Sequence, residues 1–167
     1  VRRDLMLIGF SSDTKKGYDV GILIEFINNI LYGESTMNIA VIGMGHLGQA
    51  ITKYFNSKQL KLKITAAFDI DPDKVGKTID DIPCYAMTDF EEVMENNDIS
   101  IVVLSLPAKA ATELVVPIIN AGIKGVLNFT SAPLNFPQGI FVENYDITTI
   151  LEKVAYFVKA SEESENN

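Results

Sequence analysis

The sequence predicts an α/β fold built on a parallel, doubly wound β-sheet, and three observations support this. Short apolar segments typical of buried strands alternate with segments of helical periodicity. A glycine-rich turn joins the first of these strands to a helix. Apolar residues make up 47% of the 167 residues and charged residues 22%, which is the composition of a globular protein.

The predicted strands and helices alternate from residue 37 onward. Strands are expected at 37–43, 62–69, 99–106 and 124–129, with a last short strand within 139–146. Helices are expected directly after Gly45, at 89–97 and at 107–122, where Gly122 ends the last one. Such alternation predicts parallel neighbouring strands, because a crossover helix returns the chain to the same end of the sheet.

The segments on either side of this region are predicted to be separate units. Residues 1–20 lack a periodicity of their own, and residues 21–36 are expected to form a linker helix preceded by its N-cap, Asp19. The sheet domain is predicted at 37–146, a C-terminal helix at 147–160, and a disordered acidic tail at 161–167.

Composition argues against several classes of protein. The net charge of −8 disfavours binding of nucleic acid by the whole surface. Cys84 is the only cysteine and His46 the only histidine, so we expect no internal disulfide, no zinc site and a reducing cytoplasm. No apolar run has the length of a transmembrane helix.

The first strand runs directly into GMGHLG, which places Gly43, Gly45 and Gly48 in the G-x-G-x-x-G spacing. Gly43 permits the tight turn, Gly45 lets the backbone approach a pyrophosphate, and Gly48 lets the helix pack closely on the strand. The helix N-terminus supplies N–H groups for the phosphates. The motif predicts a Rossmann-type fold that binds a dinucleotide, and the alternative is a glycine turn that binds nothing.

Asp69 ends the second strand about 20 residues after the motif, where an acidic side chain bonds to the adenosine ribose hydroxyls. A carboxylate there repels a 2′-phosphate, so we predict NADH/NAD⁺ as the cofactor rather than its phosphorylated form. Asp71 and Lys74 either line the adenosine edge or are solvated turn residues.

Further candidate contacts lie where later strands end, because ligands of open α/β sheets bind at the carboxyl ends of the strands. Pro107 and Ala108 are predicted to face the nicotinamide half, and His46 is interpreted as a loop residue beside the phosphates. The predicted cofactor-binding residues are Gly43, Met44, Gly45, His46, Leu47, Gly48, Asp69, Ile70, Asp71, Lys74, Leu106, Pro107, Ala108, Asn128, Phe129 and Thr130.

The sequence favours a protein that binds the dinucleotide without chemistry on it, and so is not an enzyme. About 20 residues follow Asp146, too few for a substrate domain with an acid–base residue. In the final helix, Ile150 and Val154 belong to a continuous apolar stripe, and Phe157 lies beside it. This stripe either packs on its own domain or is exchanged with a partner subunit.

These residues and motifs resemble those of the Rex redox-sensing transcriptional repressors of bacteria. AVIGMGHLGQAI resembles the nucleotide-binding loop of that family, and AAFDIDPDKVG its second strand and ribose-binding turn. AGIKGVLNF followed by L-N-x-P is the most specific similarity, and LEKVAYFVK follows in order. VRRDLMLIG resembles the stretch where the recognition helix of the winged helix passes into its wing, and KKGYDV resembles the far side of that wing.

The resemblance implies a homodimer whose winged helix binds operator DNA and whose Rossmann-type domain senses the NADH/NAD⁺ ratio, with NADH releasing the DNA. It implies a C-terminal helix swapped between subunits. By motif position, Tyr54 and Asp146 correspond to residues that couple the nicotinamide pocket to the dimer arrangement. The implied DNA contacts are Arg2 and Arg3 at the end of the recognition helix and Lys15 and Lys16 in the wing.

The chain also departs from the family pattern. His46 stands where the family commonly has Asn, and the wing SSDTKKG lacks the usual glycine-rich form. The resemblance implies that residues 1–20 are the remnant of a winged helix whose first part precedes Val1, so this chain alone is not expected to bind an operator properly. The alternative function is the cofactor domain of an NAD-dependent dehydrogenase or of a CoA-ligase subunit.

Overall fold

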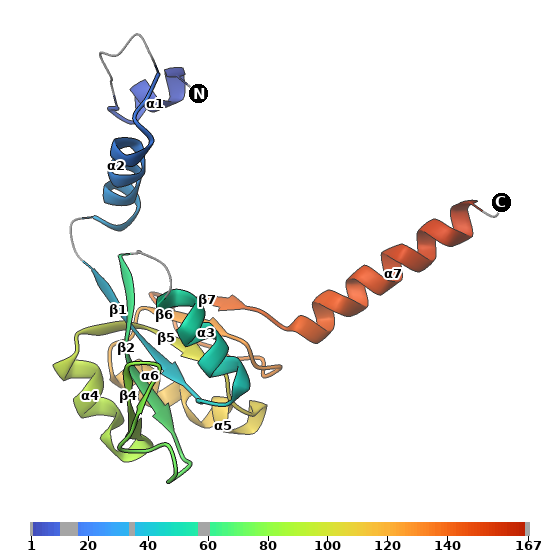
Figure 1. Ribbon diagram of the computed structural model, residues 1–167. Helices are drawn as coiled ribbons and strands as arrows, with labels where there is room; N and C mark the ends of the chain where they lie inside the picture. Colours follow the sequence, from blue (N-terminus) through green and yellow to red (C-terminus); the bar gives the residue numbers. More distant parts are fainter. Residues whose placement is uncertain (1, 11–16, 34–35, 57–60, 166–167) are drawn as a thin grey trace. The chain divides into compact units, whose positions relative to one another are not determined.

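The computed structural model describes residues 2–10, 17–33, 36–56 and 61–165 (Figure 1). It divides into two compact units, Val1–Thr36 and Met37–Asn167, which are considered separately. Within the described residues, no helix combines the length and the apolar character that crossing a membrane requires.

The first unit contains two helices, α1 (Arg2–Leu7) and α2 (Val20–Tyr32). The carboxylate of Asp19 accepts the N–H of Ile22 at 3.1 Å, which confirms the predicted N-cap of α2. Phe10 lies between the rings of Tyr18 and Phe26, with centroid separations of 5.6 and 4.9 Å. This aromatic cluster joins the segment after α1 to α2.

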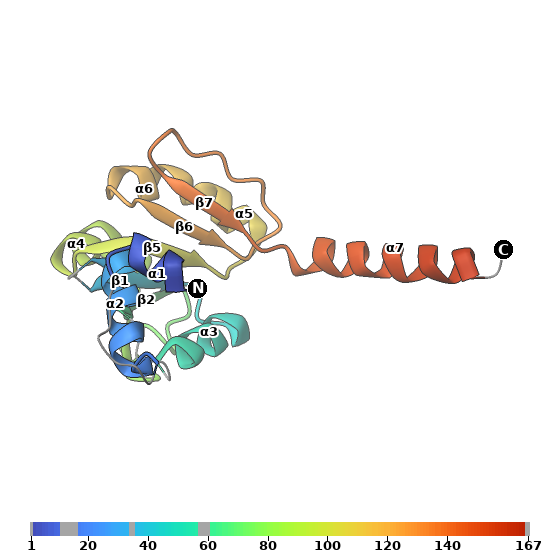
Figure 2. The same cartoon turned by 90° about the horizontal axis from the view of Figure 1, so that it is seen from above.

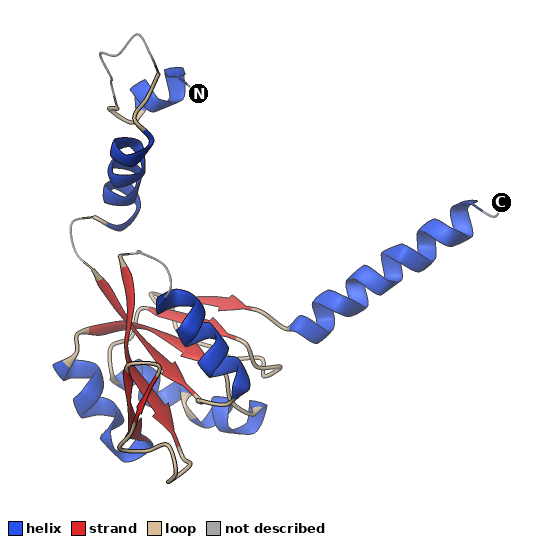
Figure 3. Cartoon of the chain, viewed as in Figure 1, coloured by secondary structure: helices blue, strands red, loops and turns tan. Residues whose placement is uncertain are grey.

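The second unit is built on a mostly parallel sheet (Figure 3). Its strands are β1 (Met37–Ile42), β2 (Leu62–Asp69), β3 (Thr78–Ile79), β4 (Ile82–Ala86), β5 (Ile99–Leu104), β6 (Gly125–Asn128) and β7 (Phe141–Asn144). Their order is β3-β4-β2-β1-β5-β6-β7, and only the short pair β3–β4 is antiparallel among the described strands. The predicted doubly wound α/β fold is confirmed.

Helices cover both faces of the sheet (Figure 2). Alternation along β1 sends Ala40 and Ile42 to one face and Ile39 and Val41 to the other. The first face is covered by α4 (Phe90–Asn96), α5 (Ala108–Glu113) and α6 (Val115–Asn120), and the second by α3 (His46–Asn56). A short 3₁₀ turn, Met87–Asp89, precedes α4. Burial on both faces explains the continuous apolar runs of the central strands.

Two parts of the sheet unit differ from the sequence-based expectation. The helix predicted at 107–122 is two helices, α5 and α6, that meet at Leu114. Pro117 causes this break because its ring collides with the carbonyl four residues earlier, at Glu113, where α5 ends. The strands β3 and β4 were not predicted, because β3 has two residues and β4 contains Pro83 and lacks alternation.

The C-terminal helix α7 (Ile147–Glu165) continues past residue 160, where the sequence predicted its end. The Ser161 hydroxyl donates to the carbonyl of Phe157 at 2.8 Å, and the glutamates that follow are good helix formers. No other element of the described sheet unit lies along α7 in Figures 1 and 2. Its apolar side chains are about half exposed, so they do not pack on their own domain.

Candidate functional site

The topology of the sheet places one crevice at the carboxyl ends of its central strands. From β1 the chain builds outward through β2 to β4, and then returns to β5, which pairs with the other side of β1. Ligands of open α/β sheets bind at such a reversal. Gly43 follows β1 and Ser105 follows β5, so these two residues form the base of the crevice.

The glycine-rich loop is tightly built, and two of its glycines are sterically required. Gly43 has φ 95°, and a Cβ there would lie 2.5 Å from the carbonyl oxygen of Ser105. A Cβ on Gly48 would overlap the carbonyl oxygen of Gly43. A Cβ on Gly45 would meet nothing within 4 Å, so this glycine leaves open space where a ligand can approach the backbone. Gly43 and Gly48 therefore have the tight turn and the close packing that the motif predicts, and the approach of a pyrophosphate to Gly45 stays a prediction.

Ser105 holds this loop, and the sequence analysis did not single it out. Its hydroxyl donates to the carbonyl of Gly43 at 2.7 Å, and its backbone N–H donates to the carbonyl of Ile42 at 2.9 Å. Serine after a buried strand has many ordinary explanations, so the sequence carried no signal for this contact. The role of Ser105 follows from its position beside the end of β1, and that position is known only once the strand order is known.

Asp69, at the end of β2, bonds to the glycine loop and to its own turn. Its carboxylate accepts the N–H of Met44 at 2.8 Å and the N–H groups of Ile70 and Asp71 at 2.8 and 2.9 Å. Lys74 adds an ion pair at 3.2 Å, and its Nζ also lies 3.3 Å from the carboxylate of Asp71. The carboxylate thus links the second strand to the phosphate loop.

Hydrogen bonding sets the protonation of this cluster. Burial raises the pKa of Asp69, but the bonds from Asp71, Met44 and Lys74 outweigh it, and the pKa is lowered overall. The pKa of Asp71 is lowered chiefly by the N–H of Asp73, and the pKa of Lys74 is raised chiefly by its bond to Asp69. Both carboxylates and the ammonium are therefore charged at neutral pH.

A cavity of about 450 Å³ lies between the glycine loop, the end of β2 and the start of α5; we call it the carboxyl-edge cavity. It is lined by Ile42, Gly43, Gly45, Phe68, Asp69, Ile70, Lys74, Met87, Ser105, Leu106, Pro107, Ala110, Glu113 and Leu114. Seven of these are predicted cofactor residues: Gly43, Gly45, Asp69, Ile70, Lys74, Leu106 and Pro107. The lining combines apolar walls with the backbone of the loop and two carboxylates, Asp69 and Glu113, and the pairing of Asp69 with Lys74 suits a nucleotide.

Several other predicted cofactor residues adjoin this cavity without lining it. His46 and Leu47 are exposed at the first turn of α3, and Ala108 begins α5. Met44 is fully buried and contributes its N–H to Asp69, while Gly48 is buried against Gly43.

Asn128, Phe129 and Thr130 lie instead beside a neighbouring cavity. Asn128 is fully buried and donates to the carbonyl of Ala132 at 3.1 Å and to the side-chain oxygen of Asn144 at 2.9 Å. Its own side-chain oxygen accepts the N–H and the hydroxyl of Thr130 at 3.0 and 2.7 Å. This network shapes a cavity of about 400 Å³, the loop cavity, lined by residues 130–135, Asn144 and Asp146.

The network also reaches the beginning of α7. The N–H of Tyr145 donates to the carbonyl of Asn128 at 2.8 Å, and the rings of Tyr145 and Phe129 stack at 5.6 Å. Asp146 accepts the Thr149 hydroxyl at 2.8 Å and the N–H of Thr148 at 3.0 Å, so it caps α7. The Thr149 hydroxyl is the main cause that lowers the pKa of Asp146.

The remaining predicted residues are placed as follows. Tyr54 is 56% exposed on α3, and its ring packs edge-on against Phe55. Ile150, Val154 and Phe157 are 48%, 55% and 58% exposed on α7. Arg3 is exposed on α1, whereas the side chain of Arg2 and the whole of Lys15 and Lys16 lie outside the described residues.

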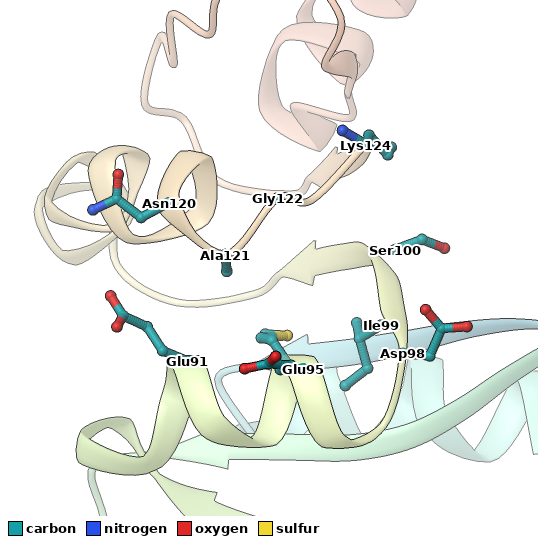
Figure 4. A pocket seen from close by; sticks show the side chains of 10 residues that line it. Glu91, Glu95, Asp98, Ile99, Ser100, Asn120, Ala121, Gly122 and Lys124 are labelled. Atoms are coloured by element: carbon teal, nitrogen blue, oxygen red, sulfur yellow. The ribbon is translucent and has the colours of Figure 1, made fainter.

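A further cavity, of about 850 Å³, lies at the opposite end of the sheet, between α4 and the end of α6 (Figure 4). Glu91 and Glu95 project from α4 on one side, and Lys124 lies on the other. Asp98 adds a third carboxylate to this amino-edge cavity. Among the described residues, no three metal-ligating side chains are arranged to hold a metal ion.

Comparison with known proteins identifies the relatives of this chain. Residues 34–132 match the family model described as CoA binding domain. The redox-sensing transcriptional repressor Rex of Listeria welshimeri is 38% identical over 159 residues, which are 95% of this chain and 74% of the relative. Rex of Leuconostoc citreum is 36% identical over 158 residues, which are 95% of this chain and 73% of the relative.

Solved structures of RSP, a Rex-family repressor, agree with these relatives. The crystal structure of RSP in complex with β-NAD⁺ and operator DNA superposes with a TM-score of 0.81 at 30% identity, covering 99% of this chain and 76% of that chain. The structure of RSP in complex with β-NADH gives a TM-score of 0.77 at 30% identity, covering 99% of this chain and 77% of that chain.

Proposed function

Because this chain belongs to the Rex family of redox-sensing transcriptional repressors, we propose that its carboxyl-edge cavity binds the adenosine and pyrophosphate parts of NAD(H). The chain is a redox-sensing repressor and not an enzyme. The observation that carries the site assignment is the glycine loop beside Asp69. Of its three motif glycines, Gly43 and Gly48 have no room for a Cβ, and Gly45 is open toward a ligand.

We assign the two halves of the cofactor to different parts of the site. The loop and the N-terminus of α3 would hold the pyrophosphate through backbone N–H groups, and Asp69 lies where the adenosine ribose is recognised. Leu106 and Pro107 extend the cavity from the end of β5 toward Ala108. We assign the nicotinamide to the loop cavity, where Thr130 and Asp146 supply polar groups. When bound, the nicotinamide reports the redox state through its charge.

The amino-terminal unit supplies the proposed DNA contacts. Arg3 is exposed on α1, which is compatible with a phosphate or groove contact. Arg2, Lys15 and Lys16 are proposed on the resemblance alone. Operator DNA is the partner that this function requires, and the bacterial cytoplasm is the proposed location because the operator lies there.

We also propose that α7 mediates a homodimer by exchange between two copies. Ile150, Val154 and Phe157 are about half exposed on α7, and exposure of so long an apolar stripe is unfavourable in water. A second copy of the chain would bury it in a symmetric interface. Tyr54 and Asp146 are proposed to couple the nicotinamide pocket to that interface, since Asp146 caps α7.

The dimer is tested by measuring the mass of the protein in solution. The double variant Val154→Asp, Phe157→Ser is expected to sediment as a monomer, whereas wild type sediments as a dimer. Glu152→Gln, exposed on the opposite face of α7, is the matched control and should leave the dimer intact. A dimer in both variants, with the same dissociation constant, would contradict the exchange.

The cofactor is tested by calorimetric titration of the chain with NADH, NAD⁺, NADPH and CoA. We expect NADH to bind more tightly than NAD⁺, and NADPH weakly. CoA is included because residues 34–132 match a family model described by that ligand. Binding of CoA alone, or of none of the four, would overturn the assignment and favour the CoA-ligase domain or a non-binding Rossmann-type domain.

A further inference from the structure

The carboxylate of Asp69 has its hydrogen-bonding capacity filled by the protein itself. Oδ1 accepts the N–H groups of Ile70 and Asp71 at 2.8 and 2.9 Å. Oδ2 accepts the N–H of Met44 at 2.8 Å and the Nζ of Lys74 at 3.2 Å. An ionised carboxylate offers about four lone-pair positions. A ribose hydroxyl that bonds to Asp69 must therefore replace one of these four donors.

Lys74 is the donor that can leave. The other three are backbone N–H groups, held in the glycine loop and in the turn after β2. Lys74 reaches Asp69 through a flexible side chain that is 27% exposed and lines the same cavity. Its ammonium also lies 3.3 Å from Asp71, whose side chain is 40% exposed. When it leaves Asp69, the ammonium keeps a charged partner.

We propose that Lys74 determines how strongly this cavity discriminates between NADH and NADPH, by competing with the ribose for Asp69. This inference rests on the proposed function. Lys74 narrows the difference in affinity between NADH and NADPH through two effects. Displacement of Lys74 weakens NADH binding, because one charge-assisted bond must be broken. The displaced ammonium stays beside the 2′ position, where it offsets the repulsion between Asp69 and a 2′-phosphate.

A purely structural role of Lys74 makes a different prediction. The turn is closed by backbone bonds, from the N–H groups of Lys74 and Val75 to the carbonyl of Asp71 at 2.9 and 3.0 Å, and from the N–H of Lys77 to the carbonyl of Lys74 at 3.1 Å. These bonds survive replacement of the Lys74 side chain. Lys74→Met therefore removes the ammonium while it keeps the length of the side chain and the turn.

The test measures dissociation constants of NADH and NADPH for the 167-residue chain and three variants. In Lys74→Met, NADH should bind more tightly and NADPH more weakly, so that their ratio widens by about tenfold, the value of one hydrogen bond to a charged group. Lys74→Arg keeps the charge and should stay near the wild-type ratio. Asp71→Asn removes the second partner of Lys74, holds the ammonium on Asp69, and should narrow the ratio.

The outcomes separate this inference from the function on which it rests. If wild type binds NADH and the ratio in Lys74→Met is unchanged, Lys74 does not set selectivity and the inference is wrong. Equal loss of both affinities in Lys74→Met, with a lower melting temperature, also overturns it, because that is the effect of a structural residue. If wild type binds neither nucleotide, the proposed function fails and this inference fails with it.

Discussion

The sheet carries a cavity at each end, of about 450 Å³ at its carboxyl edge and about 850 Å³ at its amino edge. The smaller one is bounded by a glycine loop, the N-terminus of α3 and Asp69, a carboxylate already paired with Lys74, and its second carboxylate, Glu113, is exposed at the end of α5. The larger one holds Glu91, Glu95 and Asp98 against the single lysine of its lining, Lys124. A pyrophosphate is attracted to the first and repelled by the second, so backbone and charge, and not volume, mark the ligand site.

The largest expected effect comes from adding one methyl group at the carboxyl edge of the sheet, and the same addition at the amino edge is the control. Gly45→Ala should weaken NADH binding about 100-fold, the equivalent of two charge-assisted hydrogen bonds, because the methyl group occupies the space through which the pyrophosphate reaches the backbone. Its melting temperature should stay unchanged, since the Cβ meets nothing within 4 Å in the protein. Calorimetric titration and thermal unfolding give the two values.

Gly122→Ala at the amino edge is the matched control for this change. Gly122 has φ 70°, so alanine is strained there and the protein should lose stability. Its NADH affinity should nevertheless remain that of wild type below the melting temperature. A loss of NADH affinity in Gly122→Ala as large as that in Gly45→Ala would break the distinction between the two ends.

The next effect tests the loop cavity that adjoins the carboxyl edge. Asn128→Ala should lower the free energy of unfolding by about 2 kcal/mol, because it removes four hydrogen bonds and leaves buried polar partners unsatisfied. Denaturant unfolding measures this loss. The same replacement at Asn135, an exposed residue in the lining of the loop cavity, should cost less than about 0.5 kcal/mol. Equal losses in the two variants would show that the network does not stabilise the loop.

The sequence was sufficient for the parts of the site that depend on local patterns. The glycine spacing, the strand before it and Asp69 at the end of β2 were all predicted, because each follows from residue type and separation along the chain. The contact between Ser105 and Gly43 joins the residues that follow two strands far apart in sequence, so it depends on strand order. The saturation of Asp69 by four donors likewise required the folded turn.

A smaller effect concerns the charge of Asp69 and its dependence on pH. The pKa of Asp69 is lowered in the folded protein, so its ionised form stabilises the fold. This contribution is complete above the ordinary value of 3.8 and is lost as the pH falls through the lower folded value. The free energy of unfolding of wild type should therefore exceed that of Asp69→Asn by about 1 kcal/mol at pH 7. This value allows for screening of the charge by solvent.

Denaturant unfolding of both proteins between pH 7 and pH 2 checks this dependence. The difference in unfolding free energy should shrink as the pH falls below 3.8. A difference that stays constant over the whole range would show that the charge of Asp69 does not contribute to stability.

The smallest expected effect, at the amino edge, tests whether that cavity takes part in ligand binding at all. Glu91 and Glu95 are exposed and lie four residues apart on α4, where like charges repel. Glu91 is in the first turn of the helix, whereas Glu95 is near its C-terminal end, where negative charge is unfavourable. Glu95→Gln should therefore raise the free energy of unfolding by about 0.3 kcal/mol.

The same variant should leave the NADH dissociation constant unchanged within about twofold, because charges at the far end of the sheet are largely screened. A several-fold loss of NADH affinity in Glu95→Gln would contradict this expectation, because it would show that the amino-edge cavity is coupled to the cofactor site. An unchanged affinity together with a small gain in stability would leave the carboxyl edge as the end of the sheet at which charge controls binding.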